Sequence, residues 1–254
     1  STHAAGVLIT ARPVTDYVPL QVNDEVVTTQ YPMGTLEHLG LLKMDFLGLR
    51  TLTVIRDALD LMRQIGVDMK AEEIPLDDPA VYEMISQGDT DGVFQLESGG
   101  MRAFLQNMRP ECFEDIIAAI SLYRPGPMES IPRYIAGKHD PASVQYATPL
   151  LKPILDVTYG CMVYQEQVMQ IVRDLAGYSY GRSDLVRRAM SKKKKDVMAK
   201  EREYFVHGMT DDNGNVVVEG CVRRGVPEAV AEQLFDDMTA FASYAFNKSH
   251  AAAY

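Results

Sequence analysis

The pattern of apolar and polar residues changes near residue 50. Before this point, short apolar or β-branched runs separated by proline and glycine predict strands over 6–10, 26–30 and 41–46. After it, apolar residues recur every three or four positions, as expected for helices with one buried face. This spacing predicts helices over 51–64, 79–87, 99–107, 112–122, 162–175, 182–190, 195–207 and 227–242.

These elements predict an α+β fold that is predominantly α, with a small β-containing piece over 1–50 and a mostly helical domain over 51–254. The turn dipeptide Asn213-Gly214 precedes a strand-like run and predicts a surface hairpin within 210–224. A sheet of three short strands is poor as an independent unit, so we expect it to be completed by strands that precede Ser1. The chain begins with Ser and ends in Ala-Ala-Ala-Tyr without a cap, so both ends are expected to be cut.

The composition indicates an ordinary soluble protein of 254 residues, with 46% hydrophobic and 24% charged residues. No apolar run is long enough to cross a bilayer, and we expect no signal peptide. Three well-separated cysteines without a C-x-x-C pair suit a reduced cytoplasmic protein and argue against a zinc site. We expect Cys112, Cys161 and Cys221 to be small buried hydrophobic residues.

The charge is unevenly distributed along the chain. The net charge is −10, yet the segment 182–202 holds nine Lys or Arg against three acids, a local charge of +6. The rest of the chain therefore sums to −16. A polyanion is normally bound by a basic surface, so we expect this one segment to face an anion and the acidic remainder to face away from it.

The first candidate site lies on the predicted strand 41–46. Alternation along a strand places Lys43 and Asp45 on one face. The carboxylate of Asp45 could ligate Mg²⁺ while Lys43 lies against phosphate oxygens. An ordinary surface Lys–Asp pair is the alternative.

The second candidate is the basic helix that begins near residue 182. Arg188 lies one turn from Asp184, whereas Arg187 is expected to point about 100° away from Arg188. Adjacent arginines followed by a lysine run can hold a triphosphate or a duplex backbone, and a solvated basic face is the alternative. The run consists of Lys192, Lys193, Lys194 and Lys195.

The third candidate is the pair Lys248 and His250 in a stretch of small and aromatic residues, where His250 could donate to a phosphate or a base. A capping or packing role for the histidine is the alternative. The D-x-D pair Asp89 and Asp91 lies between two glycines in a predicted loop, and we assign it no catalytic role. The chain contains neither of the glycine-rich phosphate-binding motifs, G-x-x-x-x-G-K-[ST] and G-x-G-x-x-G.

Six blocks of the sequence, spread over nearly the whole chain, carry a family resemblance. They are LLKMDFLGLRTLTVI (41–55), DGVFQLESGGMR (91–102), LYRPGPM (122–128), TYGCMVYQEQVMQI (158–171), LVRRAMSKKK (185–194) and FNKSHAAAY (246–254). In order and wording they resemble the bacterial C-family replicative DNA polymerases, the DNA polymerase III alpha subunits of the DnaE type. The segment 210–224 is longer than the linker expected in that family.

The resemblance implies a fold and a set of site residues. Residues 1–50 would be the C-terminal portion of a polymerase-beta-like palm, and 51–254 the N-terminal portion of the fingers. Asp45 matches the third of three catalytic aspartates, which together hold two Mg²⁺ ions, and the P-D-x-D motif that carries the other two is not in this sequence. The implied triphosphate contacts are Lys43, Arg187, Arg188 and His250, with Lys248 a weaker one. The implied nucleic-acid contacts are Arg124, Lys192, Lys193, Lys194 and Lys195.

The resemblance also implies a function. The whole enzyme would be a DNA-directed DNA polymerase, a nucleotidyltransferase that extends primer-template DNA with dNTPs in the cytoplasm. It would bind other replisome subunits, including the sliding clamp, through regions outside this chain, and the isolated chain would be inactive. Two alternatives stay open: an error-prone paralogue of the same family, and a non-catalytic nucleic-acid-binding module that keeps the fold.

Overall fold

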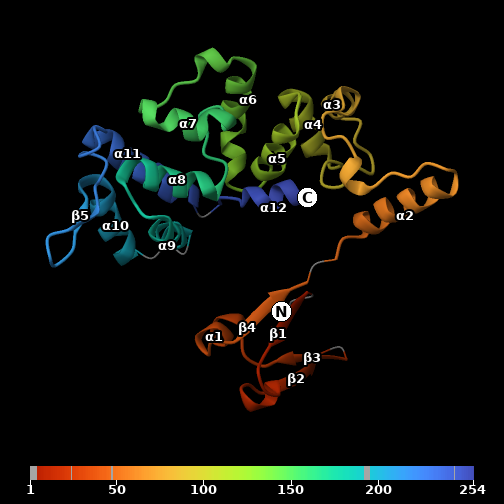
Figure 1. The fold of residues 1–254 in the computed structure, drawn as a ribbon, viewed down its shortest axis with the longest axis horizontal. Coiled ribbons are helices and arrows are strands. Elements are labelled where there is room, and N and C mark those ends of the chain that lie inside the picture. Colours follow the sequence, from red (N-terminus) through yellow and green to blue (C-terminus); the bar gives the residue numbers. More distant parts are fainter. Residues whose placement is uncertain (1–4, 24, 47, 192–194, 243) are drawn as a thin grey trace. The chain divides into compact units, whose positions relative to one another are not determined.

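A computed structural model describes residues 5–23, 25–46, 48–191, 195–242 and 244–254 (Figure 1). The chain divides into two compact units, Ser1–Ile74 and Pro75–Tyr254, and each is treated by itself. This division reflects contacts within the chain. The predicted boundary at residue 50 separates two domains of the family and need not coincide with a boundary between compact units. That domain boundary stays a prediction.

The first unit contains two antiparallel strand pairs in its described part. Strand β1 (Gly6–Ile9) pairs with β4 (Leu42–Asp45), and β2 (Leu20–Asn23) pairs with β3 (Val26–Thr29). The predicted strands near 6–10, 26–30 and 41–46 are confirmed. The prediction of one three-stranded sheet is wrong, because among the described residues β3 pairs with a fourth strand, β2, in a sheet separate from that of β1 and β4. The sequence Leu-Gln-Val-Asn after Pro19 is too short and too polar to stand out as a strand.

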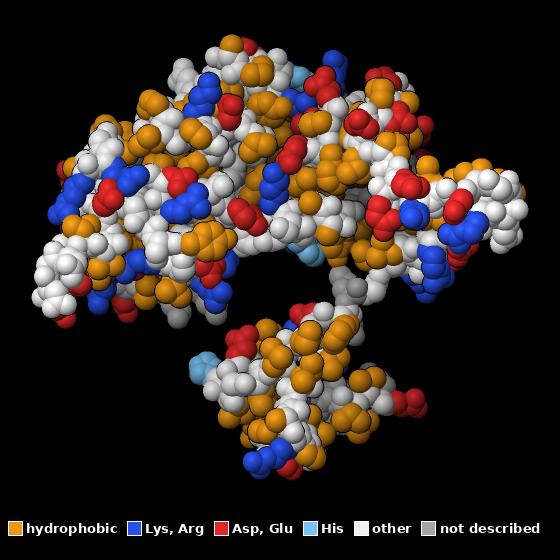
Figure 2. Space-filling model, in the orientation of Figure 1, with side chains coloured by type: hydrophobic (Ala, Val, Ile, Leu, Met, Phe, Trp, Pro, Cys, Tyr) orange, Lys and Arg blue, Asp and Glu red, His pale blue; other side chains and the backbone are white. Residues whose placement is uncertain are grey.

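Two helices complete the first unit, α1 (Met33–His38) and α2 (Arg50–Gln64). Its buried hydrophobic residues within the described ranges are Val18 and Leu36. Many other apolar side chains of this unit are exposed, as the hydrophobic surface of Figure 2 shows, including Val7, Val22, Val27, Leu42, Phe46, Leu52 and Leu61. Burial of apolar surface is the main driving force of folding, so this unit gains little from its own packing.

The second unit is helical, and all eight predicted helices are confirmed with ends shifted by at most three residues. Seven of the eight lie in this unit. The helices are α3 (Pro79–Ser86), α4 (Gly99–Met108), α5 (Phe113–Leu122), α6 (Ile131–His139), α7 (Lys152–Leu155), α8 (Gln165–Ala176), α9 (Tyr180–Ser191), α10 (Lys195–His207), α11 (Glu228–Ala242) and α12 (Lys248–Ala253). The described part of this unit thus also contains three helices that the sequence did not predict, α6, α7 and α12. Short 3-10 turns cover Val14–Asp16 and Ala71–Glu73 in the first unit, and Pro127–Ser130, Pro141–Ser143, Pro149–Leu151 and Asp156–Thr158 in the second.

The predicted hairpin is also confirmed. Strand β5 (Met209–Thr210) pairs antiparallel with β6 (Val216–Val218). Gly214 has a φ of 82°, a left-handed backbone that glycine adopts without a steric cost. The carboxylate of Asp211 accepts hydrogen bonds from the backbone N–H groups of Asn213 and Asn215, which closes the turn.

Two hydrophobic cores stabilise the second unit. One contains residues of α3, α4, α5, α6 and α12, and the other contains residues of α7, α8, α9, α10 and α11. Val163 and Tyr164 belong to the first core, whereas Val168 and Ile171 belong to the second. The first turn of α8 therefore lies where the chain passes from one core to the other, and both cores hold it in place.

The cysteine prediction is confirmed for Cys161 and Cys221, which are buried, and is wrong for Cys112, which is exposed. Cys112 is the N-cap residue of α5, and its sulfur lies 3.5 Å from an oxygen of Asp115. A residue at a helix start is held by local bonding and does not need an apolar surround. Among the described helices, none combines the length and the hydropathy that a membrane span requires.

Candidate nucleotide and nucleic-acid site

The first group of candidate residues lies on β4. Lys43 and Asp45 are two positions apart on this strand, and Lys43 Nζ lies 2.8 Å from Asp45 Oδ1, so both side chains are on one face as predicted. The lysine side chain is 18% exposed and the carboxylate 54% exposed. The carboxylate is therefore accessible to solvent, while the lysine side chain is largely covered.

The second group begins on α9, where Asp184 holds both arginines. Arg187 donates from Nε and Nη2 to Asp184 Oδ1 at 3.0 and 2.7 Å, and Arg188 Nη2 lies 2.7 Å from Asp184 Oδ2. Both arginines reach Asp184 although they are adjacent in the sequence, because residues three and four apart on a helix both lie near the same position. Hydrogen bonding from Arg187, followed by the charges of both arginines, lowers the pKa of Asp184.

The two arginines differ in exposure. The Arg187 side chain is 19% exposed and the Arg188 side chain 63% exposed. Arg187 also donates from Nη1 to Gln165 Oε1 at 2.9 Å, across to the first residue of α8. Arg187 is therefore fixed in a network, whereas Arg188 presents a guanidinium to solvent.

The third group is the short helix α12 and its cap. Asn247 is the N-cap residue, and its Oδ1 accepts from the backbone N–H of His250 at 2.8 Å. His250 is thus not the N-cap of α12. Of the capping and packing roles that were the alternatives to binding, packing is left. The His250 ring packs between Phe246 and Tyr254, with centroids 5.2 and 4.6 Å away, and His250 is exposed. Packing and binding are both compatible with this position.

Lys248 is directed towards α5. Its Nζ lies 2.8 Å from Glu114 Oε2 and 5.4 Å from the centroid of the Tyr164 ring. The ammonium group already has an acidic partner on α5.

The start of α8 joins the second and third groups. Tyr164 and Phe246 form a parallel β-bridge, and Gln165 N–H donates to Phe246 O at 3.0 Å. Glu166 accepts from Asn247 Nδ2 at 2.7 Å and from the Lys248 backbone N–H at 3.1 and 3.2 Å. Two adjacent polar residues, Gln165 and Glu166, therefore hold α9 and α12 in place.

Sequence reasoning missed Gln165 and Glu166 as site residues. The available signal was a run of polar residues, Gln165-Glu166-Gln167, at the start of an otherwise amphipathic helix. Their partners lie 22 and 81 residues away in the sequence, so a local pattern could not identify them.

Arg124 is linked to α12 through an aromatic ring. Its guanidinium carbon lies 4.1 Å from the centroid of the Phe246 ring, within the range of a cation–π contact. Arg124 is otherwise exposed, and it precedes the turn at Gly126. The structure thus brings the LYRPGPM and FNKSH segments together.

The lysine run is only partly covered by the structure. Lys192, Lys193 and Lys194 lie outside the described residues, and Lys195 is the first residue of α10. Figure 2 shows Lys and Arg side chains spread over this face of the part that carries α8 to α11, with acidic side chains between them. The visible face is mixed in charge.

No group of three or more His, Cys, Asp or Glu side chains suited to a metal ion occurs among the residues for which the structure gives a position. Asp89 and Asp91 lie in a loop, as predicted, and Asp91 forms an ion pair with Arg102.

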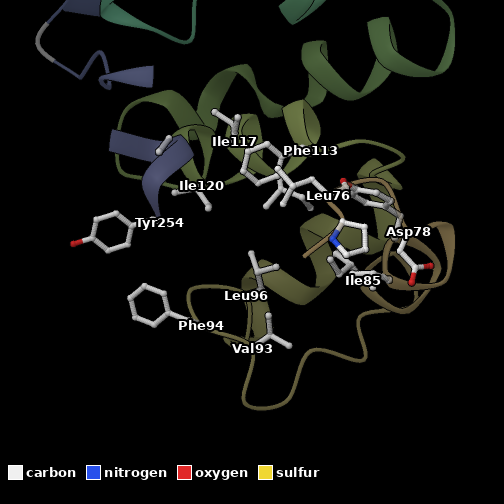
Figure 3. Close-up of a pocket in the computed structure, with 15 residues that line it drawn as sticks. Leu76, Asp78, Ile85, Val93, Phe94, Leu96, Phe113, Ile117, Ile120 and Tyr254 are labelled. Carbon is white, nitrogen blue, oxygen red and sulfur yellow. The ribbon is translucent and has the colours of Figure 1, made fainter. Parts of the chain in front are cut away.

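An apolar pocket of about 240 Å³ lies beside α12, and Ala251 of this helix and Tyr254, which follows it, form part of the pocket wall (Figure 3). Phe94 stacks on Tyr254 at 5.6 Å between ring centroids. Among the described residues that line this pocket, the single charged one is Asp78, whose carboxylate caps α3 by accepting from Ala80 N–H. The lining suits apolar groups and does not suit a triphosphate.

The candidate residues are thus divided between the two units of the chain. Lys43 and Asp45 belong to the first unit. The second unit carries the others that the structure describes in full: Arg124, Arg187, Arg188, Lys248 and His250.

Comparison with known proteins assigns both units to one family. The model of the bacterial DNA polymerase III alpha NTPase domain matches residues 1–48, and that of the bacterial DNA polymerase III alpha subunit finger domain matches residues 51–213. The DNA polymerase III subunit alpha of Thermus aquaticus is 54% identical over 261 residues, which cover 100% of this chain and 20% of that protein. That of Staphylococcus aureus (strain N315) is 48% identical over 255 residues, with 100% and 23% covered, so the chain spans less than a quarter of these relatives. The chain belongs to the family of bacterial DNA polymerase III alpha subunits.

Proposed function

We propose that this chain is part of a replicative DNA-directed DNA polymerase and holds the incoming nucleotide. In the whole enzyme, the primer 3′-hydroxyl attacks the α-phosphorus of a dNTP, a new phosphodiester bond forms and pyrophosphate leaves. Membership of the DNA polymerase III alpha family supports this reaction class. Phosphoryl transfer depends on positioning and on charge stabilisation. The contribution of this chain is therefore to position cations against the phosphates of the nucleotide.

The observation that carries the proposal is the junction at the start of α8. Arg187 is bonded to Gln165, and the segment that leads to His250 is bonded to Glu166. Two cation-bearing helices, far apart in sequence, are thereby held at one place. An arrangement of this kind suits a substrate with several negative charges.

Each cation has a proposed role. Arg187, Arg188 and His250 contact the β- and γ-phosphates of the nucleotide, and Lys43 neutralises charge on the same triphosphate from β4. Arg188 is the most available of the first three because of its exposure. Lys248 is a secondary contact, since Glu114 already pairs with it.

Asp45 is the proposed catalytic carboxylate of this chain and one ligand of a Mg²⁺ site. Its carboxylate is solvent-accessible and lies beside a cation, a setting that fits an oxygen ligand of Mg²⁺ next to bound phosphate. A single carboxylate does not hold two metal ions, so two further aspartates of the whole protein complete the site. When bound, the two Mg²⁺ ions supply charge stabilisation at the attacking and leaving oxygens.

The domain assignment is part of the proposal. Residues 1–50 form the C-terminal portion of a palm with a polymerase-beta-like fold, and residues 51–254 form the N-terminal portion of the fingers. The limits of the two matched family models, 1–48 and 51–213, support a division near residue 50. The small core and exposed strands of the first unit fit a piece of a larger domain.

Primer-template DNA is the proposed partner, contacted by Arg124 and by the lysines of the run 192–195. Other replisome subunits, including the sliding clamp, bind regions outside this chain, and the enzyme acts in the cytoplasm. Support for Arg124 comes from its contact with Phe246, which places it next to the segment that carries His250.

Primer extension by the full-length parent protein, with Mg²⁺ and dNTPs, tests the function. Asp45→Asn is expected to lower activity by several orders of magnitude while DNA binding is retained. Asp89→Asn, an exposed loop acid, is the matched control and is expected to keep activity. If the Asp45→Asn variant keeps its activity, β4 has a structural role and the assignment of Asp45 as a catalytic residue is wrong. A wild-type protein unable to extend a primer would overturn the function itself.

A further inference from the structure

We propose that Glu166 and Asn247 form a positioning pair, whose hydrogen bond sets the place of α12 and thereby of His250. The inference rests on the proposed nucleotide-binding function of α12. Neither residue is proposed to touch the nucleotide. Their effect is exerted through the position of the helix that does.

The contacts form a continuous path from α8 to His250. Glu166 Oε1 accepts from Asn247 Nδ2 at 2.7 Å, and Asn247 Oδ1 accepts from the His250 backbone N–H at 2.8 Å. Both ends of the Asn247 amide are thus used, one towards α8 and one towards α12. A side-chain amide donates at one end and accepts at the other, so the chemistry of the residue fits its position.

The carboxylate of Glu166 makes a second contact that fixes its orientation. The Lys248 backbone N–H lies 3.2 Å from Oε1 and 3.1 Å from Oε2. The hydrogen bonds that the carboxylate accepts from the side-chain amide and from the backbone N–H are both charge-assisted. The first turn of α12 is therefore held from outside the helix.

Helix α12 needs such support because it has only six residues. Helices of this length do not form stably by themselves in water, so their position depends on tertiary contacts. Ala251 is buried on one side of α12, and the Glu166–Asn247 bond holds its start.

Helix α8 is a suitable rigid support for this bond. Val168, Ile171 and Val172 are fully buried in the core that α8 shares with α9. The neighbouring residue Gln165 accepts from Arg187 of α9. A shift at the start of α8 would therefore move α12 and would also disturb the partner of Arg187.

The pair allows a donor–acceptor exchange that separates positioning from general stability. Asn247→Asp keeps the acceptor for His250 N–H but places a carboxylate against Glu166. Glu166→Gln on top of it restores a donor, since the new amide can donate to the aspartate while its oxygen still accepts from Lys248 N–H. Each single change should impair the bond, and the double change should restore it.

The experiment is single-nucleotide incorporation by the full-length protein, with KM for the dNTP and kcat measured separately. Asn247→Asp is expected to lower kcat/KM about 100-fold and Glu166→Gln about threefold, mainly through KM, because hydrogen bonds to a charged partner have this magnitude. The double variant is expected to return to within about fivefold of wild type. Glu232→Gln on α11, an exposed ion-paired glutamate, is the matched control.

Thermal unfolding and DNA binding, measured on the same variants, distinguish the outcomes. Recovery of KM in the double variant, with unchanged DNA affinity throughout, would support positioning. If the losses in kcat/KM of the two single variants multiply in the double variant, while the wild-type protein extends primers, the positioning pair is overturned and the proposed function is left intact. A wild-type protein unable to extend primers would overturn both.

Discussion

Arg187 of α9 donates a hydrogen bond to the side chain of Gln165 at the start of α8, at 2.9 Å. Its other two bonds go to Asp184, one turn earlier on the same helix. Three directed bonds on one guanidinium require the planar fork of arginine, which lysine cannot imitate. Arg187 is thus oriented in advance of any ligand, and this distinguishes it from its neighbour Arg188.

This difference predicts unequal effects of the same conservative substitution. Arg187→Lys is expected to lower kcat/KM for dNTP incorporation about 10- to 100-fold, because charge-assisted bonds are lost. Arg188→Lys keeps the charge at an exposed position and is expected to cost about threefold or less. Single-turnover incorporation by the full-length protein measures both. Equal losses would show that the network around Arg187 has no role in nucleotide use.

Asp184 gives a prediction for pH. Its pKa is lowered from 3.8 by bonding to Arg187, so the carboxylate stabilises the folded state above that value. This contribution is lost as the pH falls through the lowered pKa of the folded state. Asp184→Asn is therefore expected to unfold at a lower temperature than wild type near neutral pH, with the difference shrinking as the pH falls below 3.8.

Thermal unfolding of this chain over a pH series is the measurement. Asp237→Asn on α11, whose carboxylate accepts from the neutral amide of Gln233, is the matched control. A difference between Asp184→Asn and wild type that persists unchanged into acid would contradict the assignment of the ion pair.

Long helices with a regular apolar stripe could be predicted from the sequence, and α8 and α11 lie close to where their spacing places them. The short helix α12 could not, because its sequence Lys-Ser-His-Ala-Ala-Ala has no apolar repeat. It forms because Asn247 caps it and Ala251 packs into the core. Strand β2 was missed for a similar reason: its own residues show no clear strand pattern, and it is extended because it pairs with β3.

The candidate site shows the same limit to local reasoning. Residue patterns singled out most of the candidate cations, and the family resemblance implied their roles. The structure places Arg187 and Lys248 in networks that spacing alone does not reveal. Glu166 was not singled out because a glutamate in the first turn of a helix is expected on helix-dipole grounds alone. Its partner in the folded chain, Asn247, is what distinguishes it.

The lysine run gives a prediction about DNA binding. Changing all four residues of Lys192–Lys195 to Glu is expected to reduce the slope of log K against log salt by about three to four units, because each phosphate contact contributes about 0.9. Salt-dependent DNA binding by the full-length protein measures it. Lys152→Glu, an exposed lysine of α7, is the control and is expected to leave the slope unchanged. An unaltered slope in the fourfold variant would place the run away from DNA.

The isolated chain gives a prediction about activity. It carries one proposed metal-binding carboxylate, Asp45, and a first unit with little core, so we expect no primer extension from residues 1–254 alone. The measurement is incorporation of a labelled nucleotide at high protein concentration, with full-length protein as the positive control. Extension that is abolished by Asp45→Asn would show that the chain itself completes a metal site.

His250 and Lys248 lie two residues apart on α12 but are expected to differ in importance. The ammonium of Lys248 is paired with Glu114, and such part-exposed pairs contribute about 0–1 kcal/mol to stability. His250 is exposed and its ring lies between two aromatic rings, and the proposed function gives it a contact with a phosphate. His250→Ala is therefore expected to raise KM for dNTP about tenfold or more, and Lys248→Ala about threefold or less.

Steady-state incorporation by the full-length protein separates these two variants, and His250→Gln tests the histidine further. Glutamine keeps a donor near the ring position, so a partial recovery relative to His250→Ala indicates hydrogen bonding to the nucleotide. An equally raised KM in both histidine variants would indicate that the ring acts by packing. A larger effect of Lys248→Ala than of His250→Ala would mean that Lys248 leaves Glu114 when nucleotide binds, and the ranking proposed for the two residues would be reversed.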